Sequence, residues 1–491
     1  MTDGRTGTVL LYTIHRTDPW FRHVGRSMGF DRSYTVSDMR GEGDFCVADD
    51  FYRHEARFFG EGARESALLS AAEVKDVIAR CRVLRFMGAR RASSMALAMA
   101  EAFRSVLDDA KPDVILSFPV DRYVSDVLAR VAAKRGVPFF ELTVSAFSGM
   151  AMLMQRGVLC LGRRQPSAEE VGRHIEELTA PLFKPAYVRS AANFGPWRFL
   201  RVFAYFRVRG LFFWLLSLLR RDRLNLHYLD SQAFLGHKPH LADIRIIGMV
   251  DRVWRSKIEA FPNDKRVLFG LQLFPEASID YWIEDLALIE HEDLVFEAAR
   301  AFSADGYVVV VKDHPLQFGF RQVALIERLL SLPNVVLVPY DVSGMEVLSL
   351  CGVNFTCTGT LGLQAALAGV KSITTRNYYT TDGDFILLEN RAQVARLPEM
   401  VEAFPAVADL PARRARIVAR LLQGSFACDF FSFRGFDAAN PSAGATGVGE
   451  AAGRMIRDLM ALPHETRRCR RPPGPSPARC PDESRGEVAG A

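Results

Sequence analysis

Residues 307–315 read YVVVVKDHP, a β-branched run that stops at a charged, proline-containing turn. Such an unbroken apolar run is typical of a strand buried on both faces near the centre of a parallel sheet. Shorter runs of the same kind occur on either side, at 265–271, 334–338, 353–356 and 370–374. Segments with helical spacing separate them, at 286–302, 320–332 and 361–368. This alternation predicts a parallel sheet covered by helices.

The first half of the chain shows the same alternation. Its apolar runs lie at 8–12, 114–118 and 138–142, and helical spacing occurs at 93–107 and 125–134. The fold class is therefore α/β, with two blocks of alternating strands and helices. We divide the chain into a first domain at 1–195, a connecting segment at 196–260, a second domain at 261–463 and a tail at 464–491. The tail is rich in Arg and Pro, and we expect it to be disordered.

Composition narrows the class of protein. The 491 residues are 49% hydrophobic and 24% charged, which argues against a disordered chain and against a multi-span membrane protein. A net charge of +5, from 62 Lys+Arg against 57 Asp+Glu, is too mild to indicate nucleic-acid binding. The eight cysteines show no zinc-site spacing and indicate reduced thiols. We expect a cytoplasmic protein that binds no nucleic acid.

Residues 196–223 interleave aromatic, aliphatic and arginine side chains (PWRFLRVFAYFRVRGLFFWLLSLLRRDR). The longest apolar run, at 210–219, has ten residues, about half of what a membrane-spanning helix needs. Two interpretations stay open. The segment can lie in the headgroup region of the inner membrane, with arginines on the phosphates, or it can be a helix buried between domains.

The turn after the valine run offers groups that suit a phosphate. Lys312 is a point charge, and His314 is a directional hydrogen-bond donor. Pro315 fixes the backbone after His314, so that the imidazole is held in one direction. In open α/β sheets, ligands bind where the strands end. The alternative is an ordinary turn with a solvated lysine and a histidine that caps a neighbour.

A second loop of this kind follows the run at 353–356 and reads TCTGTLG over 356–362. Small residues at a helix N-terminus leave backbone N–H groups open, and the helix dipole there favours an anion. The loop contains the candidate phosphate ligands Thr358, Gly359, Thr360 and Gly362. N-capping by a threonine is the alternative.

A third group follows the run at 265–271. Gln272 can hydrogen-bond a base or a sugar, and Glu276 can accept a proton or hold a sugar hydroxyl. Asp280 lies four residues later, on the same face if the segment is helical. First-turn acidity that stabilises a helix is the alternative. The D-x-D spacing at 382–384 can hold a metal, but its loop is typical of a turn, so we expect no metal.

Together, these motifs resemble those of the capsular polysaccharide and surface-carbohydrate biosynthesis proteins. The resemblance is carried by Gln272 with Pro275-Glu276, by Lys312-Asp313-His314-Pro315, and by Thr358-Gly359-Thr360 with Gly362 and Ala365. It implies a GT-B architecture, in which two Rossmann-like domains face across a cleft and the second holds a nucleotide-sugar. It also implies that His314 and Pro315 serve the nucleotide phosphate, as the similar His-Pro motif does in bacterial sialyltransferases and Kdo transferases that use CMP-sugars.

The chain departs from the family pattern at three places. Leu273 and Phe274 separate Gln272 from the Pro-Glu pair, and Asp313 stands where the family has glutamate. Gln364 replaces an acidic residue of the last motif. A glutamine can bind a ribose hydroxyl but cannot act as a carboxylate, so the nucleotide preference is open.

The predicted function is a metal-independent glycosyltransferase without a cofactor, with a CMP-sugar favoured as donor and a capsule polysaccharide or lipid-linked acceptor. His314 would act on the phosphate, and Glu276 or Glu141 would be the base. Asp121 and His15 also follow predicted strands and compete for that role. A CDP-polyol phosphotransferase of the teichoic-acid type and a non-catalytic capsule assembly or export subunit are the alternatives.

Overall fold

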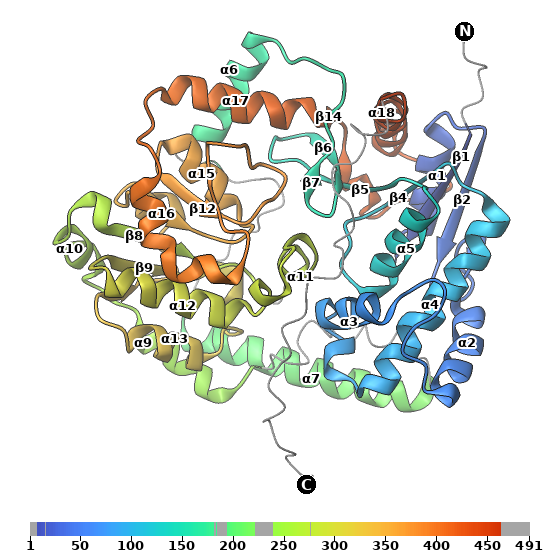
Figure 1. Cartoon of the computed structure of the whole chain (residues 1–491), viewed down its shortest axis with the longest axis horizontal. Coiled ribbons are helices and arrows are strands. Elements are labelled where there is room, and N and C mark those ends of the chain that lie inside the picture. The colour runs from blue at the N-terminus through green and yellow to red at the C-terminus, as the bar shows by residue number, and fades with distance from the viewer. Residues whose placement is uncertain are drawn as a thin grey trace.

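The computed structural model describes residues 7–14, 16–180, 183, 194–220, 239–274 and 276–462. They form two α/β domains that lie side by side (Figure 1). His15, Pro275 and the tail predicted to be disordered fall outside the described residues.

The sheet of the first domain has the order β14-β6-β5-β4-β1-β2-β3, and β7 pairs with β6. The strands are β1 (Thr8–Thr13), β2 (Arg32–Ser37), β3 (Phe45–Cys46), β4 (Val114–Ser117), β5 (Phe139–Val144), β6 (Met150–Gln155), β7 (Val158–Leu159) and β14 (Ser425–Ala427). The strands from β3 to β5 are parallel, and β6 runs antiparallel to both β5 and β14.

Helices cover both faces of this sheet. They are α1 (Asp18–Ser27), α2 (Ala48–Glu61), α3 (Ala71–Arg80), α4 (Ala89–Ala110), α5 (Tyr123–Lys134) and α18 (Ala443–Met460). Helix α6 (Ala168–Thr179) lies instead against α15 (Thr360–Ala368) and α17 (Leu410–Gln423) (Figure 1). Strand β1 is buried throughout, and its side chains alternate between the faces. Leu10 and Tyr12 join the core that includes α4, whereas Val9 and Leu11 join the core formed with α1 and α18.

The second sheet is parallel throughout, with the order β10-β9-β8-β11-β12-β13. Its strands are β8 (Arg266–Gly270), β9 (Val308–Lys312), β10 (Val335–Leu337), β11 (Val353–Phe355), β12 (Lys371–Thr374) and β13 (Ile386–Leu387). All five residues of β9 are buried, as predicted for a strand away from the sheet edge. The helices are α10 (Trp254–Glu259), α11 (Ala277–Trp282), α12 (His291–Ala304), α13 (Val323–Leu330), α14 (Gly344–Leu348), α15 (Thr360–Ala368), α16 (Leu397–Ala403) and α17 (Leu410–Gln423).

The connecting segment belongs with the second domain. It contains α7 (Pro196–Arg220) and α9 (Ile246–Met249), and residues 221–238 lie outside the described part. Phe199 and Ile246 are buried in the core of the second domain, so the segment is not a separate unit. Among the described residues, no helix has both the length and the apolar character needed to cross a membrane.

The C-terminal part of the chain returns to the first domain, which corrects the predicted boundary at 463. Strand β14 joins the first sheet, and α18 lies against α1 (Figure 1). This crossing is close because α18 presents glycines. A Cβ on Gly449 would lie 2.4 Å from the carbonyl oxygen of Val24, and one on Gly453 would lie 2.1 Å from that of Met28. Any larger residue would push the helices apart.

Candidate functional site

A cavity of about 580 Å³ lies between the two domains, at the carboxyl ends of β8 to β11. Three residues of β5 and β6 form the wall from the first domain: Thr143, Val144 and Met152. Eight residues predicted from sequence line the same cavity: Gln272, Glu276, Lys312, His314, Pro315, Thr358, Gly359 and Thr360. The parallel strands bring the three sequence motifs to one place.

The turn after β9 is organised by Asp313. Its Oδ1 accepts the His314 N–H at 2.8 Å and two N–H groups of Arg321 at 2.8 and 3.1 Å. Its Oδ2 accepts the Tyr340 hydroxyl at 2.5 Å. Asp313 and Arg321 are buried, and Arg321 also donates to the carbonyl oxygen of Gln272 at 2.6 Å. Asp313 therefore fixes the turn and ties it to the β8 loop.

His314 lines the cavity, and its hydrogen bonding makes one ring nitrogen a donor. Its Nδ1 accepts the backbone N–H of Leu316 at 3.1 Å, which assigns the proton of the neutral ring to Nε2. Burial lowers the pKa of His314 to about 4, so the imidazole is neutral at pH 7. Pro315 begins the short 3₁₀ turn that supplies this N–H. The side chain is thus a fixed neutral donor and not a cation.

Lys312 provides the cation of the cavity. The side chain is buried, and Nζ donates to the carbonyl oxygens of Asp313 at 3.0 Å and Tyr340 at 3.3 Å. An ammonium has three donors, so these carbonyls account for two. Burial lowers the pKa of Lys312 to about 8, although the nearby carboxylates of Asp313 and Asp341 oppose this. The group is therefore mainly charged at pH 7.

Gln272 connects two of the motifs. Its Oε1 accepts the backbone N–H groups of Cys357 at 3.0 Å and Thr358 at 2.8 Å. Its Nε2 donates to Thr358 Oγ1 at 2.8 Å and to Glu276 Oε2 at 3.2 Å. The predicted contact of Gln272 with a base or a sugar would require one of these bonds to be given up. In the structure, Gln272 positions the threonine loop and the Glu276 carboxylate.

The threonine loop leads into α15, whose first turn borders the cavity. Gly359 is the N-cap, and a Cβ there would lie 2.7 Å from Thr356 Oγ1. The first N–H groups of a helix have no carbonyl partner within it, and they carry partial positive charge. Thr360, the first residue of α15, lines the cavity, so this end of the helix can receive an anion.

Two of the predicted phosphate or donor ligands, Gly362 and Gln364, do not line the cavity. Gly362 is buried below the loop, where a Cβ would lie 2.5 Å from the hydroxyl of Tyr379. That hydroxyl donates to the carbonyl oxygen of Gly359 at 2.8 Å. Gly362 therefore allows the loop to pack closely, and Gln364 lies in the next part of α15.

Glu276 is the acidic residue that the third motif brings to the cavity. It is half-buried, and burial raises its pKa to about 7 despite the hydrogen bonds from Ser278 and Gln272. Asp280 is fully buried elsewhere, 3.0 Å from Arg82 and 3.4 Å from Arg85 of the first domain. The two carboxylates do not act as a pair, because Asp280 holds the domains together and Glu276 lines the cavity.

Glu141 does not reach the cavity. The sequence predicted that Glu141 lies at the end of its strand. Strand β5 continues to Val144, so Glu141 lies within the strand instead. Its buried carboxylate accepts the backbone N–H of Val120 at 3.1 Å and that of Arg156. Burial raises the pKa of Glu141 to about 7. Asp121, another candidate, does not line the cavity either.

Several lining residues were missed by the sequence reasoning. The turn at 339–344 (PYDVSG) follows β10 just as the other motifs follow their strands, and it supplies Tyr340, Asp341, Ser343 and Gly344. The strand-end rule would have found it. The same rule points to Tyr378, whose loop at 376–379 follows β12 and was predicted to close over a ligand, and to Thr143 and Val144, which end β5. Ser278, Trp282 and Met152 carry no signal of this kind.

No group of three or more His, Cys, Asp or Glu side chains is placed to hold a metal within the described parts of the chain. In the D-x-D loop, the carboxylate of Asp384 lies 2.7 Å from Arg416 and accepts the Thr381 hydroxyl at 2.8 Å. Asp382 is exposed and pairs with Arg376 at 3.5 Å. The contacts of this loop are those of a structural turn.

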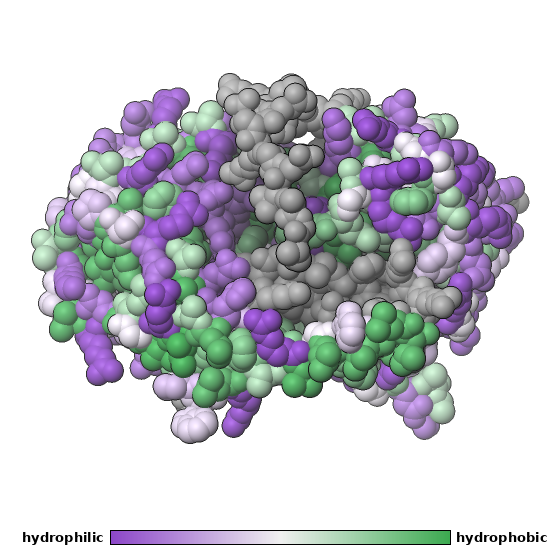
Figure 2. All heavy atoms as spheres, turned by 90° about the horizontal axis from the view of Figure 1, so that it is seen from below, coloured by the Kyte–Doolittle hydropathy of each residue, from purple (hydrophilic) through white to green (hydrophobic). Residues whose placement is uncertain are grey.

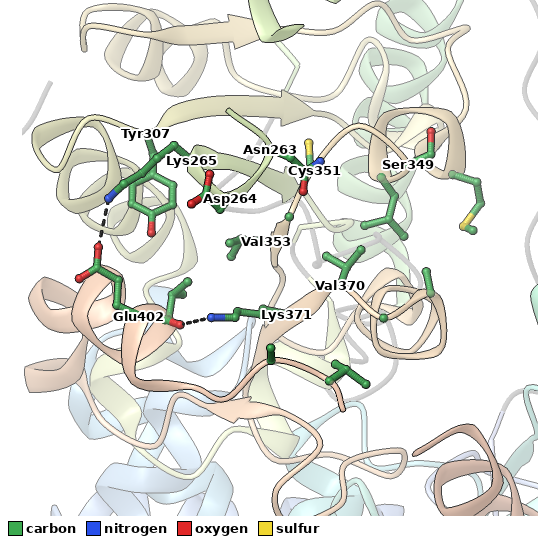
Figure 3. Close-up of a pocket in the computed structure, with 18 residues that line it drawn as sticks. Asn263, Asp264, Lys265, Tyr307, Ser349, Cys351, Val353, Val370, Lys371 and Glu402 are labelled. Atoms are coloured by element: carbon green, nitrogen blue, oxygen red, sulfur yellow. Dashed lines mark hydrogen bonds and ion pairs between the residues drawn. The ribbon is translucent and has the colours of Figure 1, made fainter. Parts of the chain in front are cut away.

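A second cavity, of about 810 Å³, opens at the opposite edge of the second sheet, where the strands begin (Figure 3). Its lysines already have partners. Lys265 Nζ lies 3.1 Å from carboxylates of both Asp305 and Glu402, and Lys371 Nζ donates to the carbonyl oxygen of Val401 at 2.7 Å. This edge is not where open α/β sheets bind ligands.

No family model matches the chain, and no curated protein matches it. The solved structures that it resembles include Thermosulfurimonas dismutans KpsC, a β-Kdo 2,7-transferase, at 12% identity and a TM-score of 0.31, over 68% of this chain and 84% of that one. They also include the calicheamicin glycosyltransferase CalG4, at 16% identity and a TM-score of 0.29, over 93% of this chain and 99% of that one. The UDP-GlcNAc 2-epimerase of Neisseria meningitidis, bound to UDP-GlcNAc, shows 12% identity and a TM-score of 0.22, over 93% and 100%.

The chain has the GT-B arrangement. Two Rossmann-like domains enclose one cavity at the strand ends, and the C-terminal helix crosses back to the first domain.

Proposed function

We propose that this chain is a glycosyltransferase that moves a sugar from a nucleotide-sugar donor to a surface glycan acceptor without a metal ion. One observation supports this most strongly: a buried ammonium, a fixed imidazole donor and a helix N-terminus line the same cavity as a carboxyl with a raised pKa. The volume of about 580 Å³ falls within the range of pockets that enclose small organic ligands.

The ammonium of Lys312, the imidazole of His314 and the N-terminus of α15 would bind the donor phosphate. Transfer of the sugar breaks its bond to phosphate, and negative charge grows on the departing oxygen. Lys312 would offset that charge, His314 would donate Nε2–H to a phosphate oxygen, and the N–H groups at the start of α15 would add further donors. The network of Asp313 and Arg321 holds this turn in place before the donor arrives, so little reorganisation is needed.

Glu276 would be the base. With a pKa of about 7, a large share of the group is ionised at neutral pH and can still accept a proton. The acceptor hydroxyl would enter between Glu276 and the wall formed by Thr143 and Met152. It would lose its proton to Glu276 as it attacks the sugar carbon, while the nucleotide phosphate leaves with the bonding electrons.

A CMP-sugar is the favoured donor because the sequence motif His314-Pro315 is similar to the His-Pro motif of the bacterial sialyl and Kdo transferases. A growing capsule polysaccharide or a lipid-linked glycan is the proposed acceptor, and the inner face of the membrane is the proposed place of work. No cofactor is required by this scheme.

A donor screen tests the proposal. CMP-, UDP-, GDP- and CDP-linked compounds are added to the full chain, and the melting temperature is measured, because a ligand of the folded state raises it. We expect CMP-sugars to raise it most, and His314→Ala to abolish the shift. His54→Ala, on α2 and remote from the cavity, is the matched control.

Product analysis then identifies the reaction. A glycosidic bond supports the proposal, whereas a phosphodiester from a CDP-alcohol would show a polyol phosphotransferase. If no donor shifts the melting temperature and no product forms, the cavity does not serve a transferase.

A further inference from the structure

Helix α7 turns one face towards the protein and an unusual face towards solvent. On the inner face, Phe199 is buried, Phe203 packs against the same core, and Val202 lies 3.1 Å from a Cβ placed on Gly319. Gly319 has a φ of +79°, so the turn after the His314 motif bends to receive the helix. The inner face is therefore an ordinary apolar packing surface.

The outer face is apolar as well. Trp197 and Leu219 are each 82% exposed, Val208 is 67% exposed and Leu211 is 58% exposed. At 100° per residue, these four point away from Phe199 and Phe203, along one strip. A helix on the surface of a globular domain usually puts polar residues there. From Trp197 to Leu219 the strip is about 33 Å long.

The charged residues of α7 are all basic. Between Pro196 and Arg220 the helix has five arginines and no Asp or Glu. Arg201 is exposed within the strip, and Arg207 is exposed at its edge while its guanidinium donates to the carbonyl oxygen of Pro239 at 2.9 Å. Apolar residues flanked by arginines are the pattern of helices that lie in the plane of an anionic membrane surface.

The position of α7 suits such a surface. The helix runs along the lower edge of the molecule in Figure 1, and Figure 2, seen from below, shows a band of hydrophobic residues on this side. Two copies packed strip to strip would bring their arginines together without any acidic partner on α7.

We propose that the outer strip of α7, centred on Trp197, Val208, Leu211, Leu215 and Leu219, docks the protein on an anionic lipid surface, with Arg201 on the headgroup phosphates. This surface is separate from the cavity and from every step of the proposed transfer. It would hold the protein where lipid-linked glycans are found.

Vesicle cosedimentation of the full chain tests the proposal. The vesicles are phosphatidylcholine alone, or phosphatidylcholine with 30% phosphatidylglycerol. We expect binding to the second kind, and we expect Leu211→Glu with Leu215→Glu to lower the partition coefficient at least tenfold. Arg201→Gln should lower it about fivefold, the effect of one interfacial charge. Phe86→Glu with Val253→Glu, at apolar residues that are more than half exposed outside α7, is the matched control.

The outcomes separate the possibilities. If neither kind of vesicle binds the chain, or if the control variant loses as much binding as the α7 variant, the proposal is wrong. If light scattering shows that the chain is a dimer and the α7 variant is a monomer, a second copy covers the strip and the lipid proposal fails. Circular dichroism confirms that each variant is folded. Turnover of a water-soluble acceptor should be unchanged in the α7 variant, so failure of docking and failure of the proposed transfer are read separately.

Discussion

Replacing Glu276 by glutamine should raise stability and remove turnover in the same protein. The folded-state pKa of this carboxyl is about 7, against an ordinary value of 4.5. The folded state therefore binds more protons than the unfolded state between pH 4.5 and 7, and the contribution of Glu276 to stability falls as the pH rises through that window. Glutamine has no such proton to lose.

The size of the effect follows from the two pKa values. A carboxyl that shifts from 4.5 to about 7 costs up to about 2.5 kcal/mol more at pH 8 than at pH 5. Glu276 is half-buried and lines an open cavity, so solvent screens part of this. We expect Glu276→Gln to gain about 1 to 2.5 kcal/mol over the wild type between the two pH values.

Urea unfolding of both proteins at pH 5 and pH 8 measures this difference, and the comparison cancels every titrating group that they share. In the same buffers, kcat/KM of the wild type should rise with pH through about 7, because the base must be ionised. The variant should lose about 10² to 10⁴ in turnover. An advantage of the variant that is equal at both pH values would show that the pKa is not raised, and near-normal turnover would rule out Glu276 as the base.

Glu141 provides the contrast. Its carboxyl is also buried and has a pKa of about 7, but it binds two backbone N–H groups and does not line the cavity. In Glu141→Gln an amide N–H replaces an acceptor beside these donors, so this variant should be less stable than the wild type at pH 5. Donor affinity per folded molecule should be retained. A loss of turnover without a loss of stability would show that Glu141 takes part in the reaction.

Further predictions concern the turn after β9. Donor affinity should weaken above about pH 8, where Lys312 loses its proton, and Lys312→Met should bind the donor weakly at every pH; isothermal titration from pH 6.5 to 9.5 measures both, and an unchanged pH dependence in the variant would be contrary evidence. His314→Gln should reduce kcat more than it raises KM, because a donor aimed at the leaving phosphate acts mainly in the transition state; equal changes would indicate uniform binding. Arg321→Met should lower the free energy of unfolding by about 3 to 5 kcal/mol, because it leaves Asp313 buried without its cation, and a loss under 1 kcal/mol in urea unfolding would contradict the buried pair.

The sequence was most informative where chemistry depends on local order. The valine run predicted β9 to within one residue, and the rule that parallel strands end at one edge placed His314 and Thr358 in one cavity. The role of Gln272 could not be predicted, because its amide bonds a loop 86 residues away. The length of β5 was also misjudged, since two further residues of apolar or β-branched character extend it and move Glu141 inside the strand.

The predicted end of the second domain at residue 463 was wrong for a related reason. Nothing in the composition of residues 443–460 marks them as part of the first domain, and their partner α1 lies more than four hundred residues earlier in the chain. The spacing of Gly449 and Gly453 indicates a close helix contact but does not say with which helix.

The return of α18 makes the two halves of the molecule inseparable by one cut. A fragment ending at residue 195 would lack both β14 and α18, and it would expose the side of β1 that carries Val9 and Leu11 to water. Such a fragment should aggregate unless residues 424–462 are supplied in trans. The polypeptide passes between the two domains twice. Any opening of the cleft must therefore bend both connections at once, which restricts the movement of one domain relative to the other to a narrow set of directions.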